Sequence, residues 1–172
     1  MDATFILLCC SIAVAVLYLG IATVKGRTLP ESLSAMVYLL KGGWRWLWTL
    51  WLWTVTLLLL PSLMDALPEG WGIVGLLTAA DLLMVGAMPL FVREHRRYHY
   101  GFAVAAGVLS QVCVALICWQ WLALWTVIII LHGLGTTPGT AGVPRWLEGR
   151  GTLVAEVICT AAVYGPLVVR HL

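Results

Sequence analysis

Four ionisable side chains lie inside long apolar segments of the chain: Asp81, His99, His132 and Glu156. Titratable groups at bilayer depth are costly, so they are retained where they bind a ligand, pair with one another or move protons. Carboxylates and imidazoles gathered in one place could carry protons, bind a cation or act as general acids and bases. These residue types therefore predict a polar site inside an otherwise apolar protein.

The depths expected for these groups bring them toward one side of the membrane. Asp81 precedes Phe91 by ten residues, about 15 Å along a helix, and Glu156 lies four residues, about 6 Å, inside its segment. The two histidines lie at the cytoplasmic ends of their segments. We predict a water-filled cup open to the cytoplasm, with Asp81 at its floor. The alternative is an internal network, such as Glu156 bonded to His132, that only fixes helix packing.

Neither a metal nor an organic cofactor is predicted. His95 and His99 have the i,i+4 spacing that allows two imidazoles to share a metal, but Arg96 and Arg97 place positive charge beside them and oppose it. The five cysteines lie in apolar runs without CxxC spacing, which indicates neither a zinc site nor a disulfide framework. No GxSxG elbow marks a nucleophilic serine.

Two tryptophans are candidates for a pocket wall. The run Trp44–Trp53 opens an apolar segment, and its first indoles suit the membrane interface. Trp51 and Trp53 lie about 10 to 14 Å beyond Trp44 along a helix, too deep for an interfacial belt. They either wall a ligand pocket or pack against lipid or a neighbouring helix.

Composition places the whole chain in a membrane. Hydrophobic residues make up 62% of the 172 residues and charged residues only 10%, and the mean hydropathy is +0.97. Soluble domains carry about a quarter charged residues. The net charge of +2 comes from basic residues in short loops, which indicates contact with the lipid bilayer and no nucleic-acid partner.

The apolar segments predict an all-α, polytopic integral membrane protein, a single six-helix bundle over residues 1–172. The expected transmembrane helices are 5–24, 44–60, 71–91, 98–118, 122–134 and 152–169. Residues 29–40 predict a short interfacial helix, opened by a capping box of Thr28 and Glu31. Their alternative is the first turns of a bent second helix. The Gly, Pro and Thr content of 135–144 predicts an irregular segment.

The distribution of basic residues predicts the orientation. Nine of the ten lysines and arginines lie in or beside the first, third and fifth loops, and Arg170 is the exception. By the positive-inside rule these three loops are cytoplasmic and both termini lie outside. The location expected is a bacterial cytoplasmic (inner) membrane.

Short motifs resemble those of a known group of membrane proteins. The segment Leu29–Ser34 follows the first helix, and His99-Tyr100-x-x-Ala103 opens the fourth. This layout resembles the small six-helix membrane proteins that include the damage-regulated autophagy modulator family and similar bacterial families of unknown function. The resemblance implies a six-helix bundle and leaves the activity open. The tryptophan run and Asp81 depart from that pattern.

Three functions are consistent with the sequence. The first is a module that binds or transports a small molecule or ion through the predicted cup. The second is a lipid-modifying hydrolase, with possible metal ligands at His95, His99, His132 and Asp81. The third is a non-catalytic membrane scaffold whose polar groups only specify packing.

Overall fold

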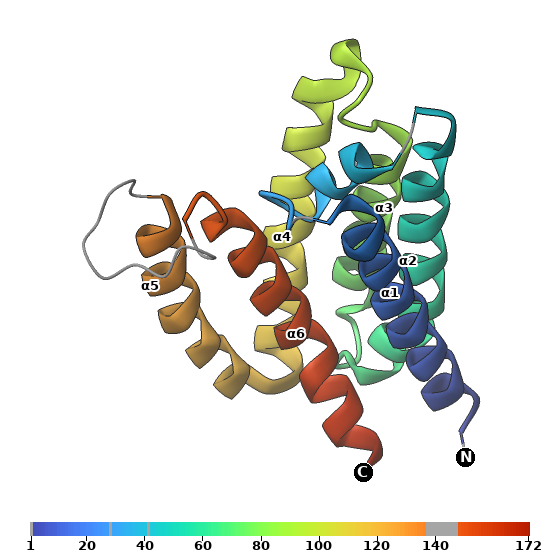
Figure 1. The fold of residues 1–172 in the computed structure, drawn as a ribbon. Helices are drawn as coiled ribbons and strands as arrows, with labels where there is room; N and C mark the ends of the chain where they lie inside the picture. The colour runs from blue at the N-terminus through green and yellow to red at the C-terminus, as the bar shows by residue number, and fades with distance from the viewer. Residues whose placement is uncertain (1, 28, 41, 137–147) are drawn as a thin grey trace.

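The computed structural model describes residues 2–27, 29–40, 42–136 and 148–172, and within them every regular element is helical. The long helices are α1 (Ala3–Gly26), α2 (Trp46–Ala66), α3 (Gly72–Ala87), α4 (Arg96–Cys118), α5 (Leu124–Thr136) and α6 (Gly151–His171). Short 3-10 helices join them: η1 (Ser34–Leu39), η2 (Gly42–Trp44), η3 (Arg93–His95) and η4 (Trp119–Ala123). Successive long helices run in opposite directions, and both termini lie at the same end of the bundle (Figure 1).

Four helical runs are long and apolar enough to cross a membrane. They are Ala3–Gly26, Gly42–Ala66, Arg93–Gly133 and Gly151–His171. The third run contains both α4 and α5, and the chain turns back between them at η4 (Figure 1). The remaining long helix, α3, is apolar but has only 16 residues. The chain is therefore an all-helical protein with four candidate membrane spans.

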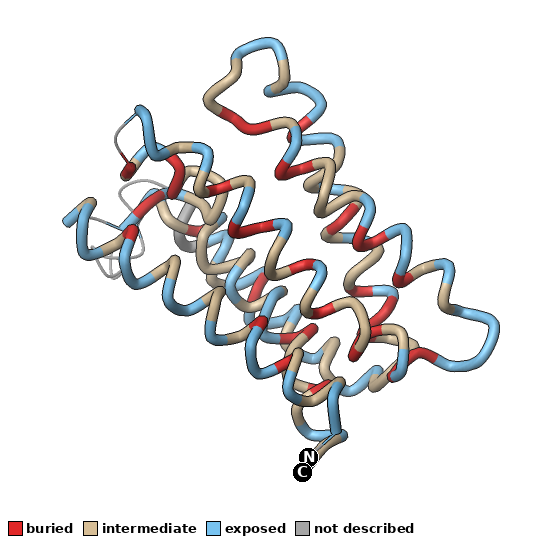
Figure 2. The backbone as a smooth tube through the Cα atoms, turned by 90° about the vertical axis from the view of Figure 1, so that its right-hand side faces the viewer, coloured by how far each residue is buried: buried red, intermediate tan, exposed pale blue. Residues whose placement is uncertain are grey.

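Apolar side chains cover much of the outer surface of the bundle. Val16 and Leu17 on α1 are 61% and 63% exposed, and Val104 on α4 is 67% exposed. Figure 2 shows exposed positions along the long helices, alternating with buried ones. An apolar surface of this extent is costly in water and suits a hydrocarbon solvent.

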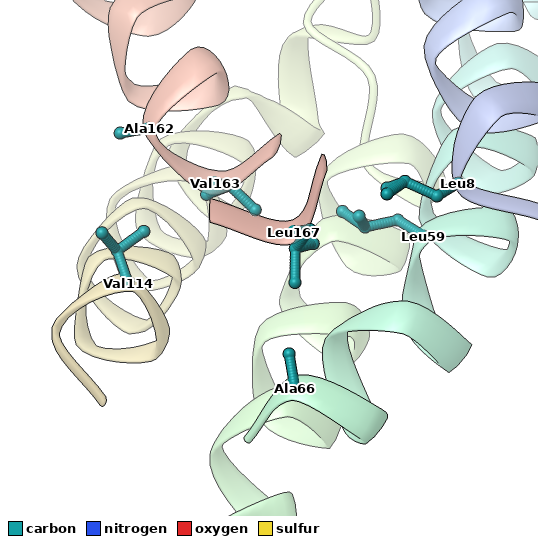
Figure 3. Packing of buried hydrophobic residues seen from close by; sticks show 7 residues of the cluster. All are labelled: Leu8, Leu59, Ala66, Val114, Ala162, Val163 and Leu167. Carbon is teal, nitrogen blue, oxygen red and sulfur yellow. The ribbon is translucent and has the colours of Figure 1, made fainter. Parts of the chain in front are cut away.

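The helices pack mainly as neighbours in sequence. α1 packs on α2, α2 on α3, α3 on α4 and α5 on α6, while α4 also packs on α6 and closes the bundle. Toward the end that holds the termini, a core cluster joins α1, α2, α4 and α6: Leu8, Leu59, Ala66, Val114, Ala162, Val163 and Leu167 (Figure 3). A second cluster, which includes Val37, Trp48 and Trp51, lies around α2 and η1.

The ends of α2 and α3 differ from the prediction. α2 does not stop at Leu60 but continues through Pro61 to Ala66. Proline lacks the N–H that would bond to the carbonyl four residues back, and its ring crowds that carbonyl, but burial of the following turn, Ser62 with Leu63, maintains the helix. α3 ends at Ala87 instead of residue 91, because Pro89 follows closely.

The segment 29–40 also differs from the expected interfacial helix. It forms the 3-10 helix η1, and Met36 and Val37 are buried against the bundle instead of lying along its surface. The predicted capping box depends on Thr28, which lies outside the described residues. Most of the segment 135–144, expected to be irregular, lies outside them as well.

Candidate functional site: a cavity beneath residues 29–40

A cavity of about 270 Å³ lies between α1, α2, α3, α4 and α6, and the segment 29–40 contributes Leu33 and Ser34 to its wall. Aliphatic side chains and indoles form most of the lining. Val157 of α6 lines the cavity and is 45% exposed, so the cavity reaches the lateral surface of the bundle there. Ligand pockets in proteins have this character, mostly apolar walls with a few polar groups.

Glu156 places a carboxylate in the cavity wall. Its Oε2 accepts a hydrogen bond from the backbone N–H of Leu33 at 2.5 Å. A second bond joins the same two segments, because the N–H of Leu153 donates to the Glu31 carbonyl at 3.0 Å. The first N–H groups of a helix lack partners within the helix, so α6 can donate one here. The segment 29–40 is thereby attached to the beginning of α6.

His99 attaches the same segment to α3 and α4. Its Nδ1 lies 2.9 Å from the Met88 carbonyl and 3.2 Å from the Val85 carbonyl, and its Nε2 lies 3.0 Å from Ser34 Oγ. Carbonyls only accept, so Nδ1 carries a proton, and in a neutral imidazole Nε2 then accepts from the Ser34 hydroxyl. Both ring nitrogens of His99 are thus bonded within the protein.

Pro89 explains why a carbonyl is free to accept from His99. The N–H of residue 89 would normally bond to the Val85 carbonyl in an α-helix, but proline has no N–H. The His99 Nδ1–H donates to this carbonyl instead. His99 is only 1% exposed, so the bond is made away from solvent.

Trp51 lines the cavity with an unsatisfied donor. Within the described part of the chain, its Nε1 is buried and has no hydrogen-bond partner, and the same holds for the Tyr18 hydroxyl. The two rings are stacked, with centroids 4.6 Å apart and an angle of 19° between their planes. Buried polar groups are nearly always hydrogen-bonded, so two neighbouring buried donors without an acceptor are unusual.

Trp53 occupies a different place from Trp51. Its Nε1 donates to the Leu83 carbonyl at 2.9 Å, and its ring lies against Gly86, where an added Cβ would come within 2.8 Å of it. Trp53 therefore joins α2 to α3 and does not line the cavity.

The structure brings together two of the four residues predicted to form a polar cup. Glu156 lines the cavity, and His99 reaches it through Ser34. Asp81 lies half-buried on α3 and His132 exposed on α5, and neither lines the cavity. The cavity is thus mostly apolar rather than a cup walled by ionisable groups.

Among the described residues, no three His, Cys, Asp or Glu side chains gather closely enough to hold a metal ion. The ligands suggested for a metal-dependent hydrolase, His95, His99, His132 and Asp81, form no such group.

Ser34 is the site residue that the sequence did not single out. It lies 65 positions from His99, and no local motif marks it. Pro89 at the end of α3 leaves a carbonyl for a nearby donor and so is a signal for His99, but it gives no signal for Ser34.

Comparison of the chain with family models, curated proteins and solved structures found no match.

Proposed function

We propose that the protein binds a small amphipathic molecule within the membrane, in the cavity beneath residues 29–40. The observation that carries the proposal is the cavity itself, about 270 Å³ with mostly apolar walls and with Ser34 and Glu156 among its lining residues. Trp51 in the same wall has a buried Nε1–H with no partner in the described part of the chain, and an unmade hydrogen bond of this kind costs about 1–3 kcal/mol.

The walls indicate the chemistry of the ligand. Aliphatic residues from five helices favour an apolar body, whereas Ser34 and Glu156 offer a polar end at the segment 29–40. The volume of about 270 Å³ is near the lower end of ligand pockets, ~300–1000 Å³, and favours a single small molecule. The exposed Val157 in the lining supports access from the lipid phase.

A cavity-filling variant tests the proposal. A Cβ added at Gly107 or at Gly101 meets no atom within 4 Å, but only Gly107 lines the cavity. Gly107→Leu should fill the cavity, and Gly101→Leu, on the same helix, is the matched control. Native mass spectrometry of protein purified from membranes should detect a small-molecule adduct on the wild type and on Gly101→Leu, and none on Gly107→Leu. Identical spectra for all three proteins would contradict the proposal.

We further propose that all six long helices cross the membrane, with both termini outside in a bacterial cytoplasmic membrane. The alternating direction of the helices supports this topology (Figure 1). So does the charge distribution, since Arg93, Arg96 and Arg97 precede or open α4, at the end of the bundle away from the termini. We likewise propose that the chain shares the six-helix layout of the damage-regulated autophagy modulator group.

A further inference from the structure

Ser34 and His99 have the geometry of a nucleophile and its base. The serine hydroxyl donates to Nε2 across 3.0 Å, and the proton on Nδ1 is fixed by the Met88 and Val85 carbonyls. A neutral imidazole whose free nitrogen faces a hydroxyl can take that proton as the oxygen attacks. The contact is within the range expected of such pairs, about 2.6–3.2 Å.

Ser34 and His99 differ in their access to the cavity. Ser34 lines the cavity, whereas His99 does not and is only 1% exposed. A molecule in the cavity therefore meets Ser34, and His99 lies behind it. When His99 accepts a proton, the two carbonyls at Nδ1 can stabilise the resulting imidazolium, a role that a carboxylate fills in other hydrolases.

We propose that Ser34 is the nucleophile and His99 the general base of a membrane-embedded hydrolase that acts on amphipathic carboxylic esters. The inference rests on the proposed binding function and names the class of its ligand.

The reaction needs water as its only co-reactant. Ser34 Oγ attacks the ester carbonyl carbon while its proton passes to His99 Nε2. The tetrahedral intermediate then expels the alcohol, which leaves with the proton from Nε2, and Ser34 is acylated. Water attacks the acyl group and gives a proton to Nε2. Collapse breaks the bond between the acyl carbon and Oγ, the carboxylic acid leaves, and the proton returns to Ser34.

Glu156 serves as a positioning residue in this scheme. Its carboxylate holds the N–H of Leu33, the residue immediately before the nucleophile. Because Leu33 and Ser34 are consecutive, the bond from α6 and the bond from α4 together fix the serine between the two helices. Glu156→Gln keeps an acceptor at this position and should retain reactivity, whereas Glu156→Ala should reduce it.

Covalent labelling tests the inference. Purified protein in detergent is treated with a decyl fluorophosphonate, and the modified residue is mapped by peptide mass spectrometry. Ser34 Oγ should form a bond to phosphorus as fluoride leaves and the hydroxyl proton passes to His99. Ser34→Ala should abolish labelling, and His99→Gln should slow it by about 100-fold or more.

Two controls separate reactivity from folding. Ser62 is buried, donates to the Thr4 carbonyl at 2.7 Å and lies outside the cavity, so Ser62→Ala should label at the wild-type rate. Ser34→Ala should elute as the wild type does in size-exclusion chromatography. An unlabelled wild type, or a label on Ser110 instead of Ser34, would overturn the inference. Both of these outcomes are measured on the wild-type protein, so the test does not depend on how His99→Gln folds.

The outcomes also distinguish this inference from the binding function on which it rests. A wild type that retains a small-molecule adduct but leaves Ser34 unlabelled disproves the hydrolase and keeps the binding site. A labelled Ser34 in a protein that carries no adduct removes support for stable ligand binding, while the reactive serine stands.

Discussion

His99 bonds to two carbonyls at the end of α3 and to Ser34 in the segment 29–40. It donates to the Val85 carbonyl, which Pro89 leaves without its usual donor, and to Met88, while accepting from Ser34. A residue that satisfies three groups at once is sensitive to substitution, since each buried group left unpaired carries its own desolvation cost.

Replacing His99 by leucine should therefore destabilise the protein. Each buried carbonyl or hydroxyl left unpaired costs about 1–3 kcal/mol. Thermal unfolding in detergent should show a clear fall in melting temperature. His95→Leu is the control, because the buried Nδ1 of His95 has no hydrogen-bond partner in the described part of the chain and little is lost with it. Equal melting temperatures for the two variants would contradict the role given to His99.

At the scale of elements, the segment 29–40 depends on bonds to helices on both sides. Glu156 and Leu153 of α6 bond to it, His99 of α4 bonds to Ser34, and the Tyr38 hydroxyl donates to the Leu90 carbonyl at 3.0 Å beyond the end of α3. A segment without a long helix of its own is thus held in place by its neighbours.

Loss of the Glu156 carboxylate should loosen this segment. A hydrogen bond contributes about 0.5–1.5 kcal/mol net, so Glu156→Ala should speed exchange of the Leu33 amide about 2- to 10-fold. Hydrogen–deuterium exchange measures this directly. Glu156→Gln preserves an acceptor and should leave the rate closer to that of the wild type. Unchanged exchange in Glu156→Ala would show that the bond does not hold the segment.

The helix α3 carries a carboxylate that its neighbours do not pair. Asp81 is half-buried and makes no hydrogen bond or ion pair with the described residues. In the proposed six-span topology α3 crosses the membrane, where an aspartate at the centre of the helix costs about 2.5–3.5 kcal/mol on insertion scales. Asp81→Leu should therefore raise the melting temperature in lipid nanodiscs. Asp65→Leu, which removes the exposed partner of Arg170 at 3.5 Å, should change it little. A fall for Asp81→Leu would mean that the carboxylate has a stabilising partner.

At the scale of the whole molecule, the proposed topology predicts which segments face the cytoplasm. Alkaline phosphatase is active only outside the cytoplasm, so a fusion after Leu172 should be active and a fusion after Arg97 inactive. Green fluorescent protein fusions at the same two positions should give the opposite pattern. Activity of the phosphatase after Arg97 would reverse the orientation derived from the basic loops.

Composition and periodicity were sufficient to predict an all-helical membrane protein. Long apolar runs can satisfy their backbone only as helices in hydrocarbon, so the approximate positions of α1, α4 and α6 follow from local sequence. The end of α2 does not follow from local sequence, because burial of the turn after Pro61 outweighs the tendency of proline to end a helix. The fold of residues 29–40 likewise depends on bonds to distant helices.

The candidate site, like the fold, was predicted only in part from the sequence. The sequence identified His99, Glu156 and Trp51 as unusual, because polar groups and indoles stand out in an apolar chain. Only the tertiary structure placed Ser34 against His99 and the Leu33 amide against Glu156, across 65 and 123 positions. It also left Asp81 and His132 away from the cavity. The type of a residue is local information, whereas its partner depends on which helix faces pack together, and that is decided by the bundle as a whole.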